Sequence, residues 1–178
     1  MDEFLGKLSS YNLFVNLVPG CIFMFYLQEL RCVVQILNTE NSVTVFTLLC
    51  LWYVIGIVIN RVGSLVIEPL YKKFNIILFA SYDDYVNAEK QDNKITLLSE
   101  VNNFYRSMVA LFSAIILSEI TLNKFDMEIM KGNWFILIIL LMCFVIFSLS
   151  YRSQTRYIKS RIEATLKSRT NFKCCLQR

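Results

Sequence analysis

Three long stretches of this 178-residue chain contain no Asp, Glu, Lys or Arg, and they limit what the chain can fold into. They cover residues 8–28, 41–60 and 132–151, which is 20 or 21 positions each. Because a helix rises about 1.5 Å per residue, each stretch reaches about 30 Å, the thickness of the hydrocarbon core of a bilayer. Charged residues make up only 18% of the chain, against about a quarter in soluble globular proteins. The sequence therefore predicts an all-α integral membrane protein.

A fourth uncharged run, residues 107–118, has 12 positions and is too short to cross a bilayer alone. It becomes a span if its helix extends over about residues 105–122. With four spans, the N-terminus, the middle connection and the tail lie on one side and carry 15 of the 18 Lys and Arg residues. The positive-inside rule then places both termini in the cytoplasm. We predict four transmembrane helices, with short cytoplasmic helices between and after them.

This topology divides the chain into four parts. They are a first transmembrane hairpin (1–60), a cytoplasmic helical connection (61–106), a second transmembrane hairpin (107–151) and a basic amphipathic tail (152–178). In the connection, Ser81 and Asp84 have capping-box spacing and predict a short helix through about Gln91. A second helix is predicted to start at Lys94 and to continue into the third span, and the extension of the second span should end or bend near Pro69.

Polar residues inside the predicted spans have two interpretations. Asn16 and Pro19 lie in the first span, Asn60 lies at the inner end of the second, and Glu119 lies near the outer end of the third. Asn16 either repairs the helix at Pro19 and joins neighbouring helices, or it lines a polar path. Glu119 either reaches outward to water or surrounds a pore mouth in an oligomer.

Small residues form one face of the third span, at Ser107, Ala110, Ala114 and Ser118. Such a face lets helices approach closely, within one chain or between chains. Residues 135–147 of the last span include no Gly, Ala or Ser. We therefore expect the third span to be central, the fourth to be peripheral, and the chain to form a homo-oligomer.

The tail carries the clearest binding signal, with eight basic residues and one acidic residue in 152–178. On a helical wheel Arg152, Arg156, Lys159 and Lys167 share one face, beside an apolar stripe. This surface is predicted to bind anionic membrane lipid or to dock an acidic cytosolic protein. Direct nucleic-acid binding is not expected, because no motif interleaves aromatic and basic residues.

The residue inventory argues against an enzyme. The chain has no histidine, which excludes Ser-His and Cys-His catalysis and His-ligated metals. The acidic residues Asp83, Asp84, Glu89 and Asp92 are of metal-binding type but lack EF-hand spacing, so a solvated helix face is the alternative. We expect no catalytic residues, no bound metal and no cofactor.

The length, the four spans, the short outward connections and the segment 11–20 resemble small bacterial membrane proteins of phage-defence operons, in particular the membrane subunits of Kiwa systems. The resemblance implies a homo-oligomeric inner-membrane sensor. Such a sensor recruits a soluble, DNA-binding cytosolic subunit when a phage perturbs the envelope. A pore-forming effector or small ion channel is the competing function.

The distribution of basic residues yields a topology prediction. Reporters fused to either terminus should report a cytoplasmic location, and single cysteines at Asn38 and Lys124 should react with an impermeant reagent from outside. A C-terminus reached from the outside would contradict the four-span arrangement.

Overall fold

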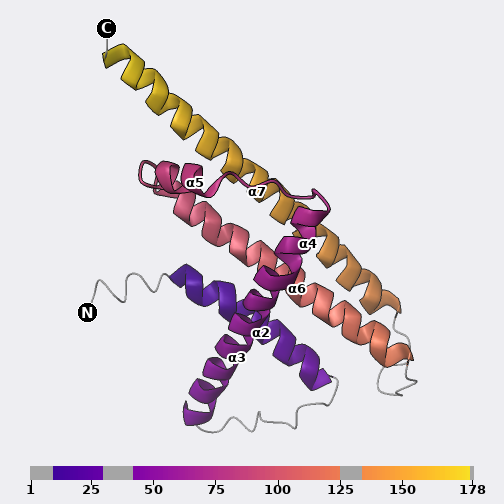
Figure 1. The fold of residues 1–178 in the computed structure, drawn as a ribbon. Coiled ribbons are helices and arrows are strands. Elements are labelled where there is room, and N and C mark those ends of the chain that lie inside the picture. Colours follow the sequence, from indigo (N-terminus) through magenta and orange to yellow (C-terminus); the bar gives the residue numbers. More distant parts are fainter. Residues whose placement is uncertain (1–9, 30–41, 125–133, 177–178) are drawn as a thin grey trace.

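The computed structural model describes residues 10–29, 42–124 and 134–176, so Asn38 and most of the predicted outward connections lie outside the described residues. Within these ranges the chain is helical, apart from a link at 74–81 and a turn at 90–93. The elements are α2 (Ser10–Glu29), α3 (Ser42–Val62), η1 (Gly63–Ile67), α4 (Glu68–Lys73), α5 (Tyr82–Glu89), α6 (Lys94–Lys124) and α7 (Trp134–Leu176). Figure 1 shows them.

Three stretches of helix are long and apolar enough to cross a membrane: Val45–Lys73, Lys94–Thr121 and Phe135–Ser168. In addition, Leu13–Glu29 forms a shorter apolar helix. The all-α class is therefore confirmed, and the arrangement is compatible with a multi-pass membrane protein. The short uncharged run 107–118 lies within one continuous helix of 31 residues.

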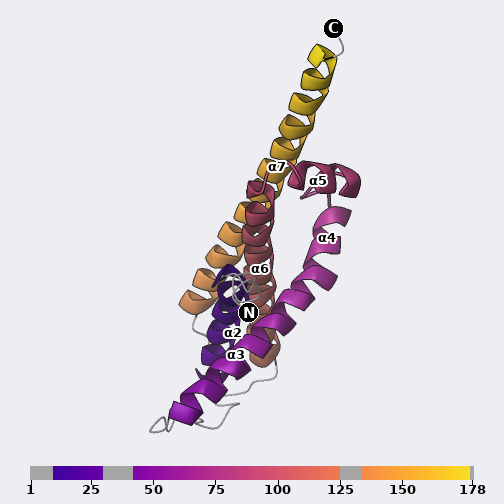
Figure 2. The same cartoon turned by 90° about the vertical axis from the view of Figure 1, so that its left-hand side faces the viewer.

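Helix α6 is the centre of the structure, because it contacts α2, α3, η1, α5 and α7 (Figures 1 and 2). Its residues Val109 and Leu111 are fully buried, whereas the first half of α7 exposes large apolar side chains such as Phe135 and Met142. Helix α6 is thus central and the first half of α7 peripheral, as the small and large residues of these two segments predict.

Two glycines allow a close approach of α2 and α3 where these helices cross (Figure 1). A Cβ atom added to Gly56 would lie 1.6 Å from the backbone oxygen of Asn16, and one added to Gly20 would lie 1.8 Å from that of Trp52. Only glycine fits at either position, so the two backbones pack against each other directly. The sequence did not predict this contact from Gly56.

The predicted small face of α6 is divided. Ser107 and Ala110 are buried inside the chain, and a Cβ atom on Gly63 of η1 would lie 3.5 Å from that of Ala110. Ala114 and Ser118 are half-buried. The first pair of small residues therefore serves packing within one chain, and the second pair stays partly accessible.

Between α3 and α6 the chain passes through η1, α4, the link and α5. α3 continues through the π-helical turn η1 into α4, where Pro69 occupies the first turn, a position that proline tolerates. Asn75 (φ 54°) then reverses the chain. The extension ends at Lys73, four residues after the proline, and does not break at the proline itself.

The two helix starts predicted in the middle connection are confirmed. Ser81 accepts a hydrogen bond from the backbone N–H of Asp84 (3.2 Å) and begins α5, which ends at Glu89 rather than at Gln91. Helix α6 begins at Lys94 as expected.

Helix α7 is continuous for 43 residues, from the apolar stretch into the basic tail. Ile158 and Ile162 of α7 pack with Ala88 of α5 and Ile95 of α6 in a small second core. The start of the basic tail therefore packs against α5 and α6. The rest of α7 projects beyond α5 (Figure 1).

We call the contact of α2 with α3 at Gly20 and Gly56 the glycine crossing. It predicts that replacing different glycines by alanine lowers the stability of the protein by different amounts. Gly56→Ala and Gly20→Ala should each destabilise the protein, by about 1–3 kcal/mol or more, because α2 and α3 must separate to admit the methyl group. Gly63→Ala, whose nearest neighbour would be 3.3 Å away, should cost much less. The melting temperatures of the three variants are measured by thermal unfolding in detergent. Equal melting temperatures would refute the close contact at the glycine crossing.

Candidate functional site

Five polar residues form a connected layer at the end of the bundle that lies nearest α4 and α5. The guanidinium of Arg106 on α6 donates to Glu68 (2.7 Å) and to Asn60 (3.3 Å). Asn60 in turn donates to Asn16 of α2 (3.1 Å), and Lys72 donates to Glu68 (2.8 Å). We call Asn16, Asn60, Glu68, Lys72 and Arg106 the polar layer.

Burial explains why the polar layer is connected. The side chains of Arg106 and Glu68 are only 14% and 20% exposed. A poorly solvated charge needs a partner of opposite charge and further hydrogen bonds. Gly63 lies directly against Arg106, since a Cβ atom there would lie 3.3 Å from the backbone oxygen and 3.4 Å from the Cγ of Arg106.

The polar layer borders a pocket of about 350 Å³, lined among others by Asn16, Asn60, Arg61 and Arg106. The structure thus brings Asn16 and Asn60 together, as parts of one hydrogen-bonded contact between α2 and α3. Pro19 is buried one turn along α2. Glu119 is not part of this site: it lies near the far end of α6, and one of its carboxylate oxygens is buried without a hydrogen bond inside the described ranges.

A second contact ties α4 to α7. The hydroxyl groups of Tyr71 and Ser148 are 2.7 Å apart, and the ring of Tyr71 packs on that of Tyr151 at 5.9 Å. Because the link 74–81 comes directly after α4, this contact sets where the link passes over α7.

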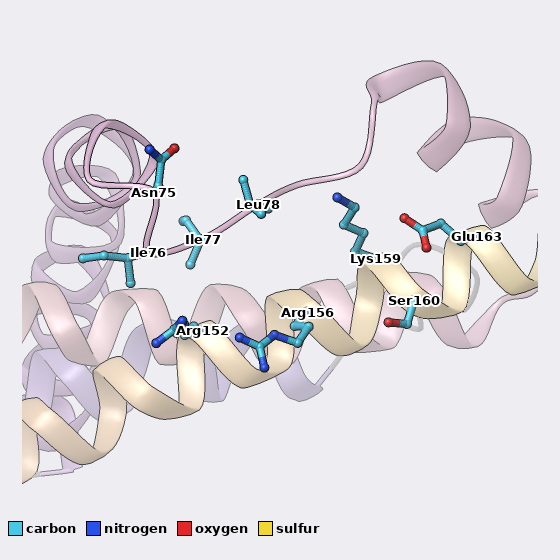
Figure 3. Close-up of a pocket in the computed structure, with 9 residues that line it drawn as sticks. All are labelled: Asn75, Ile76, Ile77, Leu78, Arg152, Arg156, Lys159, Ser160 and Glu163. Atoms are coloured by element: carbon cyan, nitrogen blue, oxygen red, sulfur yellow. The ribbon is translucent and has the colours of Figure 1, made fainter.

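Three of the four predicted docking residues line one pocket of about 310 Å³ between the link and α7 (Figure 3). These are Arg152, Arg156 and Lys159, and the opposite wall is formed by residues 75–78. We call this the basic pocket. Lys167 lies outside it, so the predicted basic face is divided into a pocket and a distal part.

The acidic residues near α5 have structural roles. Asp92 accepts a hydrogen bond from Arg161 of α7 (2.7 Å) and another from the backbone N–H of Lys94, and these two bonds hold the pKa of its carboxyl below the usual value. Asp84 belongs to the helix cap, and Glu89 accepts from Thr96. In the part of the chain that the structure describes, no group of three His, Cys, Asp or Glu residues could hold a metal ion.

Sequence reasoning missed the ion pair between Glu68 and Arg106, which are 38 residues apart. The available signal was Glu68 itself, a carboxylate in an apolar helical extension that would need a cation nearby. It also missed the facing wall of the basic pocket, since residues 75–78 contain no charge to mark it.

Comparisons with protein-family models, with curated proteins and with solved structures found no match. The functional argument therefore rests on the residues of this chain.

The polar layer predicts a hierarchy of substitutions. Arg106→Gln and Glu68→Gln should each lower stability by about 1–3 kcal/mol, the range for hydrogen bonds to charged groups, and the double variant should lose less than the sum. Lys72→Gln removes the other partner of Glu68, a lysine that is 51% exposed, and should cost well under 1 kcal/mol. Chemical denaturation in detergent tests this order, and additive losses would contradict a direct pair.

Proposed function

We propose that this chain is a membrane scaffold with four spans and both termini in the cytoplasm, which recruits a soluble acidic protein through the distal part of α7. The observation that carries the proposal is the continuity of α7. One helix of 43 residues joins the apolar bundle to a strongly basic end. A partner held there would be mechanically connected to the membrane.

The described helices support four spans. The uncharged run of the first span covers 21 residues in the sequence, and its helix packs against α3 through the glycine crossing. The short uncharged run at 107–118 lies in the central helix, surrounded by the others. In this topology the polar layer and the basic pocket both lie at the cytoplasmic boundary.

The distal part of α7 suits a soluble partner better than lipid. Lys167 lies 15 residues beyond Arg152, which is about 22 Å along a helix. The field of an anionic membrane surface decays within a Debye length, about 8 Å at physiological salt. Positive charge at this distance attracts an acidic surface in solution more effectively than it attracts the bilayer.

Self-association is part of the proposal. Ala114 and Ser118 remain half-buried on α6, and Leu117 beside them is exposed. A small-residue patch next to an exposed leucine supports close contact with another copy in the bilayer. Together with the resemblance to phage-defence membrane subunits, this supports a homo-oligomeric sensor at the bacterial inner membrane that passes an envelope signal to a cytosolic effector.

The pocket of about 350 Å³ beside the polar layer favours a second candidate, a pore or small channel. Asn16, Asn60, Arg61 and Arg106 would line its inner mouth. This function requires ion flux by the purified protein in liposomes, whereas the scaffold conducts nothing.

Charge reversal tests recruitment. The triple variant Lys167→Glu, Arg169→Glu, Lys173→Glu should insert into the membrane normally. It should lose its cytosolic partner in pull-downs from membranes, because the introduced carboxylates repel the acidic surface of the partner. The matched control, Lys73→Glu, Lys90→Glu, Lys94→Glu, makes the same charge change at exposed positions off α7 and should recruit as well as the native chain. Loss in both variants, or in neither, would refute docking on the distal part of α7.

A further inference from the structure

We propose that the basic pocket binds the phosphate of an anionic phospholipid headgroup. The proposal rests on the membrane topology proposed above, and it assigns Arg152, Arg156 and Lys159 to lipid, leaving the distal part of α7 for the protein partner.

The cations of the basic pocket are free to bind a ligand. Arg152, Arg156 and Lys159 are spaced by four and three residues, so they lie on one side of α7, where all three line the pocket (Figure 3). None of them forms an ion pair within the described ranges, whereas Arg106, Arg161 and Lys72 all do. The only carboxylate among the lining residues is Glu163, which leaves the pocket with a net charge of about +2.

The chemistry of the cations favours phosphate. A guanidinium offers a planar pair of N–H donors that match two phosphate oxygens, and a lysine adds a point charge. Two arginines and one lysine on a single pocket can therefore surround one phosphate group. The volume, about 310 Å³, is sufficient for a headgroup but too small for a folded protein surface.

Three of the four residues on the opposite wall of the basic pocket, Ile76, Ile77 and Leu78, are apolar, which indicates an amphiphile. Ile77 is buried and holds the link against the core, while Leu78 is 62% exposed. Phe74, just before the pocket, is 64% exposed. A free anion gains nothing from these side chains, whereas the acyl chains of a lipid can pack on them as its phosphate meets the arginines.

The depth of the basic pocket agrees with a headgroup. Arg152 directly follows Tyr151, the last residue of the uncharged run 132–151. In the proposed topology it therefore lies where the hydrocarbon core ends and the phosphates begin. Basic pockets between helices on the cytoplasmic side are a general mode of anionic-lipid recognition.

Lipid retention by the purified full-length protein tests the proposal. The protein is placed in nanodiscs of equal parts phosphatidylglycerol and phosphatidylcholine. It is then released from the nanodiscs in the mass spectrometer, and the lipids that stay bound are identified from the native mass. The native chain should retain phosphatidylglycerol several-fold over phosphatidylcholine. The variant Arg152→Gln, Arg156→Gln, Lys159→Gln should retain the two lipids in the ratio of the nanodisc.

Two controls separate a built site from diffuse positive charge. Lys73→Gln, Lys90→Gln, Lys94→Gln removes equal charge outside the pocket and should leave the preference intact. Leu78→Asp keeps all three cations but places a carboxylate on the facing wall, and it should reduce retention. Leu97→Asp, at a similarly exposed leucine on α6, should not. Equal losses from the pocket variant and its lysine control would overturn the proposal, as would a native chain without preference.

Further arms identify the source of the phosphate. Excess inorganic phosphate should fail to displace the retained lipid, since it lacks the acyl chains; displacement would assign the pocket to a free anion. Loss of the cytosolic partner in the pocket variant, with lipid retention unchanged, would assign it to an acidic protein and overturn the proposal. The lipid assay contains no partner, so its failure leaves recruitment by the distal part of α7 a separate question.

Discussion

The arrangement of this molecule depends on one poorly solvated guanidinium. Arg106 lies on the central helix with its side chain 14% exposed, where it donates hydrogen bonds to Glu68 and Asn60. Leaving it unpaired would cost several kcal/mol, so the chain must bring a carboxylate to it. Glu68 fills this role because α3 continues through η1, which lies against α6 at Gly63. The ion pair therefore couples the position of α4 to the packing of the bundle.

The position of α4 determines the course of the link 74–81. Tyr71 contacts Ser148, which brings the link across α7, where it forms one wall of the basic pocket. Beyond the link and α5, Arg161 holds Asp92 and fixes the start of α6 against α7. The long helix is thus held at two levels, by Tyr71 at Ser148 and by Asp92 at Arg161, and it continues beyond them. This division of α7 is the physical basis for assigning lipid and protein partners to different turns.

The features that the sequence predicted are local or periodic. Uncharged runs identified the apolar helices, the Ser81 cap identified α5, and the alternation of basic and apolar positions identified the continuation of α7. The features that it missed depend on pairs of residues far apart in the chain. Gly56 meets Asn16, and Glu68 meets Arg106, only after the helices adopt a particular crossing and register. The sequence context of Glu68 indicates that this carboxylate needs a cation nearby, but it does not indicate which one, and nothing in the sequence indicates the contact at Gly56. The basic pocket shows both cases: its cations were predicted, while its second wall required the fold.

The register between η1 and α6 is the most direct measure of this arrangement. A Cβ atom at Gly63 would lie 3.5 Å from that of Ala110, close to the separation in a disulfide. In a chain whose native cysteines are replaced, Gly63→Cys with Ala110→Cys should therefore form a disulfide on mild oxidation in membranes. Gly63→Cys with Ala114→Cys, one turn away, should not. Cross-linking of the second pair in place of the first would mean that η1 meets α6 in another register, which would separate Glu68 from Arg106 and remove the basis for the pocket.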